Sequence, residues 1–190
     1  MLLQEEYESC EQLVELTQAG SVQLVIPAYS FVEPLETLRR RHGERAQLAQ
    51  SARKQLQLLK RSTSFADAVP DADTVERLFR DSTSLEAGRL REVQDRLLAC
   101  STVVPLTAEI LESAAQARQR FDLSGQDSVV LASVLSHLDQ WKPEEACFIN
   151  RDSKDFDDPA IVDALDTRRC KLLSRFQDGF GYVTKRIKMS

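Results

Sequence analysis

Three acidic side chains, far apart in the sequence, stand beside short apolar runs that have the character of buried strands. Glu33 comes shortly after the run 22–27, and Asp152 comes directly after the run 146–150. Asp127 opens the apolar helix that leads into the run 146–150. Because ligands of an open α/β sheet gather outside the carboxyl ends of its strands, we expect these three carboxylates to meet at one edge of a sheet.

A cluster of carboxylates is unfavourable unless a cation lies within it, because like charges raise one another's pKa values and repel. Mg²⁺ and Mn²⁺ prefer oxygen ligands and need only a few carboxylates from the protein. A metal held in this way can activate a water molecule for attack on a phosphodiester. The spacing therefore predicts a Mg²⁺ or Mn²⁺ site with hydrolytic chemistry.

Each carboxylate also has a purely structural interpretation, which stays open. Ser30-x-x-Glu33 and Ser124-x-x-Asp127 both match the capping box, in which a hydroxyl and a carboxylate satisfy free amides at the start of a helix. Pro34 complicates the first of these, since a proline deep in a helix removes a hydrogen bond. Asp152 can equally stabilise a turn.

The elements that must position these residues follow from the apolar periodicity. It predicts helices over 2–19, 31–61, 74–80, 85–99, 108–120, from 124 onward and over 159–167, and short strands within 22–27, 101–106, 146–150 and 171–174. The residues after 174, which include Tyr182 and Val183, are interpreted as a glycine-containing tail. Strands that alternate with longer helices are typical of parallel crossovers and of an α/β sandwich. We expect a single domain over residues 1–190.

Composition restricts the class of protein further. The 190 residues carry a net charge of −5, so a nucleic acid could bind only at a local basic patch. The four cysteines are widely spaced and lie among apolar neighbours, which is typical of free thiols in a reducing compartment. Residues 1–20 are too acidic for a signal peptide, and no apolar run approaches the roughly 18 residues of a membrane span. We therefore expect a cytoplasmic protein that does not bind membranes.

A local basic patch is present in the long helical stretch. Residues 33–61 have a net charge of +5, which leaves −10 for the rest of the chain. At about 100° per residue, one side of this helix collects most of the basic residues, which we predict to bind a phosphate backbone: Arg39, Arg40, Arg53, Lys54, Lys60 and Arg61. Arg41 and Arg45 lie nearer the apolar side and do not fit the division. The alternative is an ordinary solvated helix face.

Three segments together resemble the motif blocks of the PIN-domain family. They are Leu24-Val-Ile-Pro-Ala-Tyr-Ser-Phe-Val-Glu33, Gln126-Asp-Ser-Val-Val-Leu-Ala-Ser133 and Cys147-Phe-Ile-Asn-Arg-Asp-Ser-Lys-Asp-Phe156. Their order and the helices between them also fit, so the resemblance covers nearly the whole chain. It implies a three-layer α/β/α sandwich with a short parallel sheet and cleavage of RNA with Mg²⁺ or Mn²⁺.

The resemblance also assigns roles to single residues. By position, Glu33, Asp127 and Asp152 match three acidic metal ligands of the family. Asn150 stands where the family has a Thr, Ser or Asn beside the metal, and Asp155 is an accessory carboxylate. Many small members are toxins of toxin–antitoxin pairs, which implies a small antitoxin protein as a partner, and homodimers are frequent in the family.

One block of the family pattern is missing. Family members begin with a strand that ends in an Asp and lies in the middle of the sheet, whereas this chain starts with residues that resemble the helix after it. Either Met1 is not the true start of the protein, which we favour, or this member has lost full activity. In the second case the chain would be a catalytically impaired module that binds a protein or RNA partner.

Overall fold

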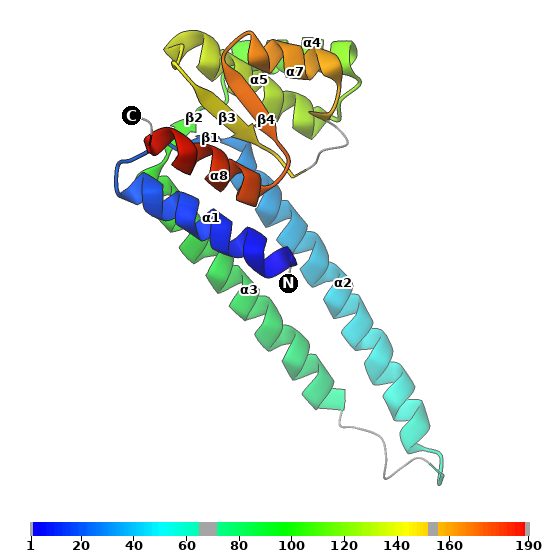
Figure 1. The fold of residues 1–190 in the computed structure, drawn as a ribbon. Helices are drawn as coiled ribbons and strands as arrows, with labels where there is room; N and C mark the ends of the chain where they lie inside the picture. Colours follow the sequence, from blue (N-terminus) through cyan, green and yellow to red (C-terminus); the bar gives the residue numbers. More distant parts are fainter. Residues whose placement is uncertain (1, 65–71, 152–155, 189–190) are drawn as a thin grey trace. The chain divides into compact units, whose positions relative to one another are not determined.

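The computed structural model describes residues 2–64, 72–151 and 156–188. The chain is a mostly helical α/β protein with short parallel sheets (Figure 1). It divides into two compact units, residues 1–30 with 97–190, which we call the sheet unit, and residues 31–96, which we call the hairpin unit. Two compact units can belong to one domain, so the expectation of a single domain over 1–190 stays a prediction.

Four short strands lie in the sheet unit, and their positions agree with the four apolar runs of the sequence. They are β1 (Val25–Pro27), β2 (Thr102–Val104), β3 (Ala146–Ile149) and β4 (Cys170–Leu173). β1 pairs in parallel with β2, and β3 pairs in parallel with β4. Among the described residues these pairs form two separate two-stranded sheets, where the sequence predicts one. The strands are therefore present, but the sheet is divided.

Three helices build the core around these strands: α4 (Ala108–Phe121), α5 (Gly125–Trp141) and α7 (Pro159–Asp166). Leu131 of α5 is fully buried in a cluster that includes Ile161 and Leu165 of α7 and contacts both β3 and β4. Ala132, the next residue of α5, lies in a second cluster with Val104 of β2. α5 therefore packs against both sheets, which explains why it is apolar nearly all round.

Two further helices of the sheet unit, α1 (Leu2–Gln18) and α8 (Phe176–Ile187), pack side by side (Figure 1). α8 lies so close to β3 that a Cβ atom at Gly179 would be 2.2 Å from Cδ1 of Ile149. The sequence interpretation of this segment as a tail was wrong. Phe180, Val183 and Ile187 recur at helical spacing, but the two glycines of the segment concealed the pattern.

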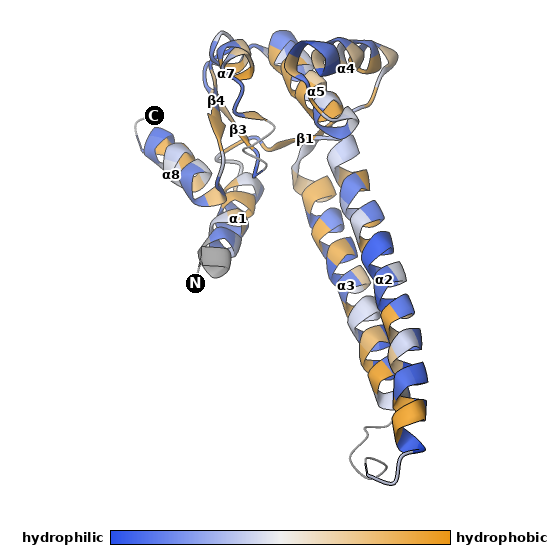
Figure 2. Cartoon of the chain, turned by 90° about the vertical axis from the view of Figure 1, so that its right-hand side faces the viewer, coloured by the Kyte–Doolittle hydropathy of each residue, from blue (hydrophilic) through white to orange (hydrophobic). Residues whose placement is uncertain are grey.

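The hairpin unit consists of most of α2 (Tyr29–Lys60) and of α3 (Ala72–Cys100). No described residue of this unit is buried, although apolar residues recur along both helices (Figure 2). The sequence predicts separate helices over 74–80 and 85–99, which was wrong, because α3 is continuous. Ser82 lies in the expected gap, and its hydroxyl accepts a hydrogen bond from Arg45 of α2 at 3.2 Å.

Two helix ends are fixed by residues next to them in the sequence. Gly20, just after α1, has a φ of 71°, a left-handed conformation that glycine adopts without strain. Asp158 caps α7 by accepting a hydrogen bond from the N–H of Ala160 at 2.7 Å, and Pro159 opens that helix. Within the described part of the chain, every helix is too short or too polar to cross a lipid bilayer.

Candidate functional site

Asp127 lies in the first turn of α5 and is half-buried. Its backbone N–H donates to Oγ of Ser124 at 3.1 Å, and the Ser124 hydroxyl donates in return to Oδ2 of Asp127. The capping alternative for this carboxylate is thus present in the structure. The Ser124 hydroxyl occupies one oxygen of the carboxylate, and a carboxylate has about four acceptor positions. Capping and metal binding by Asp127 are therefore compatible.

Asn150 directly follows β3 and is half-buried. Its N–H donates to the carbonyl of Leu173 at 2.9 Å, which continues the ladder with β4 and fixes the position of the residue. α5 and β3 are joined by only four residues and pack in the same core, so they run in opposite directions. The start of α5, with Asp127, and the end of β3, with Asn150, consequently lie toward the same end of the sheet unit.

Glu33 is an exposed residue of α2 and belongs to the hairpin unit. The capping box that Ser30 and Glu33 could form is absent, because α2 begins at Tyr29 and Ser30 is already inside the helix. Pro34 follows inside the same helix, where it removes one backbone hydrogen bond. The capping interpretation of Glu33 was therefore wrong, and its role as a metal ligand stays a prediction.

Asp152 and Asp155 lie outside the described residues. Within the ranges 2–64, 72–151 and 156–188, no three His, Cys, Asp or Glu side chains are grouped so that they could hold a metal. The donors that the structure does position toward one end of the sheet unit, the Asp127 carboxylate and the Asn150 amide, are both oxygen ligands. This donor set fits a hard divalent cation better than a soft one.

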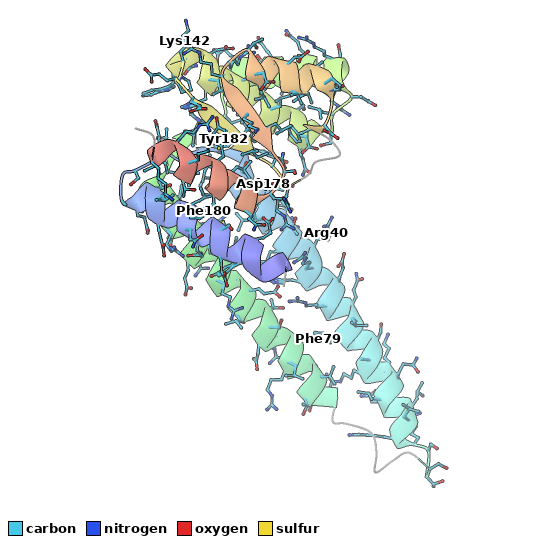
Figure 3. All side chains as sticks on the ribbon, viewed as in Figure 1. Arg40, Phe79, Lys142, Asp178, Phe180 and Tyr182 are labelled. Atoms are coloured by element: carbon cyan, nitrogen blue, oxygen red, sulfur yellow. The ribbon has the colours of Figure 1, made fainter. Side chains whose placement is uncertain are left out.

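The basic residues of the predicted RNA-binding face are exposed on α2 and just after it, as the helical spacing predicts (Arg40 in Figure 3). The positive charge of Arg53 is offset by two carboxylates of α3, because Arg53 pairs with Glu76 at 3.1 Å and with Asp73 at 3.6 Å. Arg40 and Lys54 form no ion pair with any residue that the structure describes. The face is thus more uneven in charge than the sequence indicates.

Arg45, which did not fit the division into a basic and an apolar side, faces α3. Its guanidinium lies 2.7 Å from Oε1 of Glu86, and both side chains are mostly covered. The hydrogen bond between them raises the pKa of Arg45 and lowers that of Glu86. A basic residue on the apolar side of a helix, with an acidic residue on the neighbouring helix, is the sequence signal that could have revealed this pair.

A surface depression of about 560 Å³ lies at the opposite end of the strands. Its lining residues include Glu145, Lys171 and Tyr182. Glu145 directly precedes β3, Lys171 lies in β4, and Tyr182 lies on α8 (Figure 3). Glu145 accepts hydrogen bonds from Arg186 at 2.8 Å and from Tyr182 at 2.8 Å. Because ligands of α/β sheets gather at the carboxyl ends, this paired cluster is not the candidate site.

The same hydrogen bonds shift the pKa values of the cluster. Arg186 first and Tyr182 second lower the pKa of Glu145 to about 2. Burial, and then the bond to Glu145, raises the pKa of Tyr182 to about 12. Both groups therefore keep their ordinary charge states at neutral pH. This indicates that their hydrogen bonds hold α8 to the segment before β3 and do not form an acid–base site. The spacing of Tyr182 and Arg186, four residues apart on one helix face, was a signal that the sequence interpretation missed.

A family model described as PIN domain matches residues 1–156 of the 190. The matched region includes Glu33, Asp127, Asn150 and both predicted acidic residues that follow β3. Comparison with curated proteins gives no match, and comparison with solved structures gives none either.

Proposed function

Because the chain belongs to the PIN-domain family, we propose that it is an endoribonuclease that depends on Mg²⁺ or Mn²⁺. Proteins with this domain are generally nucleases, which supports hydrolysis of phosphodiester bonds at the coarse level. The observation that carries the proposal is the match of the family model to residues 1–156. The oxygen donors held toward one end of the sheet unit support it.

The proposed metal ligands are the residues that the motif blocks supply: Glu33, Asp127, Asn150, Asp152 and Asp155. When bound, the metal would supply an activated water as nucleophile and charge stabilisation for the departing oxygen. The chain's own contribution is to hold the donors in place. The Ser124 hydroxyl orients the Asp127 carboxylate, and the ladder bond to Leu173 holds the backbone of Asn150.

The basic residues of α2 would hold the phosphate backbone of the RNA. Arg40 and Lys54 carry charges that are not neutralised by described neighbours, so they are available to replace the counterions of an RNA strand. No aromatic residue lies among the basic residues of this stretch, which favours backbone contact over base stacking. The proposal extends to a cytoplasmic toxin of a toxin–antitoxin pair, with a small antitoxin protein as partner and a homodimer as the assembly.

A second function, from a different class, is favoured by one specific observation. The Ser124–Asp127 capping box is formed, so this carboxylate has a structural role whether or not a metal binds. In this alternative the chain is a catalytically impaired PIN-like module that binds a protein or RNA partner.

Metal-dependent cleavage distinguishes the two functions. Single-stranded RNA would be incubated with the protein and Mn²⁺ or Mg²⁺, with and without excess chelator. The nuclease proposal predicts cleavage that the chelator abolishes and that added metal restores. Binding of RNA without cleavage under any metal condition would contradict the nuclease and support the binding module. Cleavage that survives the chelator would contradict the metal dependence, provided that the protein has been repurified to homogeneity.

A further inference from the structure

The N-terminal part of α2 contains Glu33 and, directly after it, a proline inside the helix. In a regular helix the N–H of residue 34 bonds to the carbonyl of Ser30, four positions earlier, but Pro34 has no N–H. The proline ring also crowds that carbonyl. The helical backbone is therefore weakest in the segment that carries Glu33.

One side chain of α3 bonds to the backbone of this segment. Nε2 of Gln94 donates to the carbonyl of Phe31 at 2.8 Å. Phe31 lies two residues before Glu33 and three before Pro34. α2 and α3 lie side by side (Figures 1 and 2), so this bond joins residues 63 positions apart in the sequence. The Gln94 amide therefore supports the backbone of α2 beside the interruption at Pro34.

Gln94 occupies a position of α3 that faces α2. It follows Leu90 by four residues and Glu86 by eight, so the three side chains share one face of the helix, and all three are half-buried. Glu86 pairs with Arg45 of α2, which shows that this face points toward α2. At such a position an apolar side chain would add to the packing between the helices. The glutamine instead supplies a hydrogen-bond donor to the α2 backbone.

We propose that Gln94 is a positioning residue for Glu33 and that it acts through the backbone of α2. This inference rests on the proposed function, in which Glu33 is a metal ligand. Glu33 is exposed and forms no ion pair with any residue that the structure describes, so the place of its carboxylate depends on the backbone that carries it. By holding the carbonyl of Phe31, Gln94 keeps this turn helical. A ligand on an ordered turn binds metal more tightly than one on a frayed turn, because less conformational entropy is lost on binding.

Removal of the donor tests the support of the backbone without any metal. Gln94→Met keeps an unbranched side chain of similar length and deletes the N–H donor. The matched control is Leu90→Ala, which loosens the same face of α3 and leaves the bond to Phe31 in place. Amide hydrogen exchange of the metal-free chain is followed by NMR. We expect the amides of Glu33 and Leu35, on either side of the proline, to exchange at least fivefold faster in Gln94→Met than in the control.

Binding of Mn²⁺ alone tests the positioning of Glu33. The free ion is measured by electron paramagnetic resonance with the chain of 190 residues and no RNA. We expect Gln94→Met to weaken Mn²⁺ binding about tenfold, as is typical of residues that orient metal ligands, and Leu90→Ala to leave it unchanged. In a Glu33→Gln background, Gln94→Met should have no further effect, because the ligand through which it acts is absent.

Three results would overturn the proposal. One is equal exchange at the two amides in Gln94→Met and Leu90→Ala. Another is an equal affinity for Mn²⁺ in the wild type and Gln94→Met, or an equal loss in Gln94→Met and Leu90→Ala. The third is a loss of the same size with and without Glu33→Gln, because Gln94 would then act on the whole hairpin unit. If Gln94→Met does not fold, Gln94→Ala takes its place.

The same measurements separate this proposal from the proposed function. A wild-type chain that does not bind Mn²⁺ contradicts the metal-dependent function, and the positioning role with it. Weaker binding in Glu33→Gln together with normal binding in Gln94→Met contradicts the positioning role alone.

Discussion

Arg45 of α2 and Glu86 of α3 form a salt bridge of 2.7 Å across a pair of helices in which no described residue is buried. Arg45 also donates to the Ser82 hydroxyl at 3.2 Å, so one side chain links two positions of α3. A helix pair without a buried core depends more strongly on such polar contacts than a packed helix does. This relationship makes the hairpin unit sensitive to a single charge.

We therefore expect Arg45→Met to lower the urea midpoint of the protein, measured by circular dichroism at 222 nm. The substitution leaves the Glu86 carboxylate and the Ser82 hydroxyl without their partner in a largely covered position. Arg39→Met is the matched control, because Arg39 pairs with Glu36 at 3.7 Å with both side chains well exposed, and such pairs contribute little. Equal shifts for the two variants would contradict the prediction.

The two interpretations of Asp127 predict opposite results for two neighbouring substitutions. If Asp127 binds metal, Asp127→Asn lowers RNA cleavage at least 100-fold with little change in the thermal midpoint, since the Ser124 cap of the backbone remains. Ser124→Ala removes the cap and lowers the free energy of unfolding by about 1 kcal/mol, while cleavage falls less than in Asp127→Asn, because the carboxylate itself remains. Cleavage rates and unfolding curves for both variants test this. An Asp127→Asn protein that cleaves normally excludes the carboxylate as a ligand.

Low pH acts on the link between Glu145 and α8. The pKa of Glu145 is about 2 in the folded protein, below its ordinary value of 4.5. The ionised carboxylate therefore stabilises the fold above pH 4.5, and this contribution is lost as the pH falls toward 2. We expect Glu145→Gln to flatten the decrease of the thermal midpoint over this pH range. Glu144→Gln, at the neighbouring exposed position, serves as the control and should follow the wild-type profile.

The core of the sheet unit depends on Leu131, which has no exposed surface. Leu131→Ala should lower the free energy of unfolding by about 2–5 kcal/mol, because the lost contacts leave a cavity between α5 and its neighbours. Leu111→Ala on α4 is the control, since Leu111 is 49% exposed and its replacement should change stability by no more than about 0.5 kcal/mol. Chemical denaturation of both variants measures the difference.

RNA binding should reveal the uneven charge of α2. For single strands, log K falls with log salt concentration by about 0.7 for each neutralised phosphate. We expect Arg40→Gln and Lys54→Gln each to reduce this slope by about 0.7. Arg53→Gln should reduce it less, because Arg53 already pairs with Glu76 and Asp73. Fluorescence anisotropy at several salt concentrations gives the slopes, and a largest effect at Arg53 would contradict this assignment.

The features that follow from local sequence were predicted well. The four strands each depend on a few neighbouring residues, and all four are confirmed. The continuity of α3 was missed because the pair between Arg45 and Ser82 joins residues 37 positions apart. The helix α8 was missed because the reason for a glycine at position 179 is its close contact with Ile149, which belongs to a strand distant in the sequence.

The candidate site could be predicted only in part, for a related reason. Asp127 and Asn150 are positioned by a helix start and a strand end, both of which can be recognised in the sequence. The division of the sheet cannot be recognised in this way, because it depends on which strands find partners across the whole chain. Glu33 and the acidic residues after β3 stay predictions that depend on the family pattern.

The contact between Gly179 and Ile149 has a consequence for how the C-terminal part of the chain tolerates change. A Cβ atom at 179 would lie 2.2 Å from Cδ1 and 2.9 Å from Cγ1 of Ile149, so with alanine there either the Ile149 side chain turns away or α8 shifts. Tyr182 and Arg186 lie on the same helix, so a shift of α8 would also weaken their hydrogen bonds to Glu145. Where α8 shifts, one added methyl group weakens the attachment of this C-terminal helix although no charged residue is replaced.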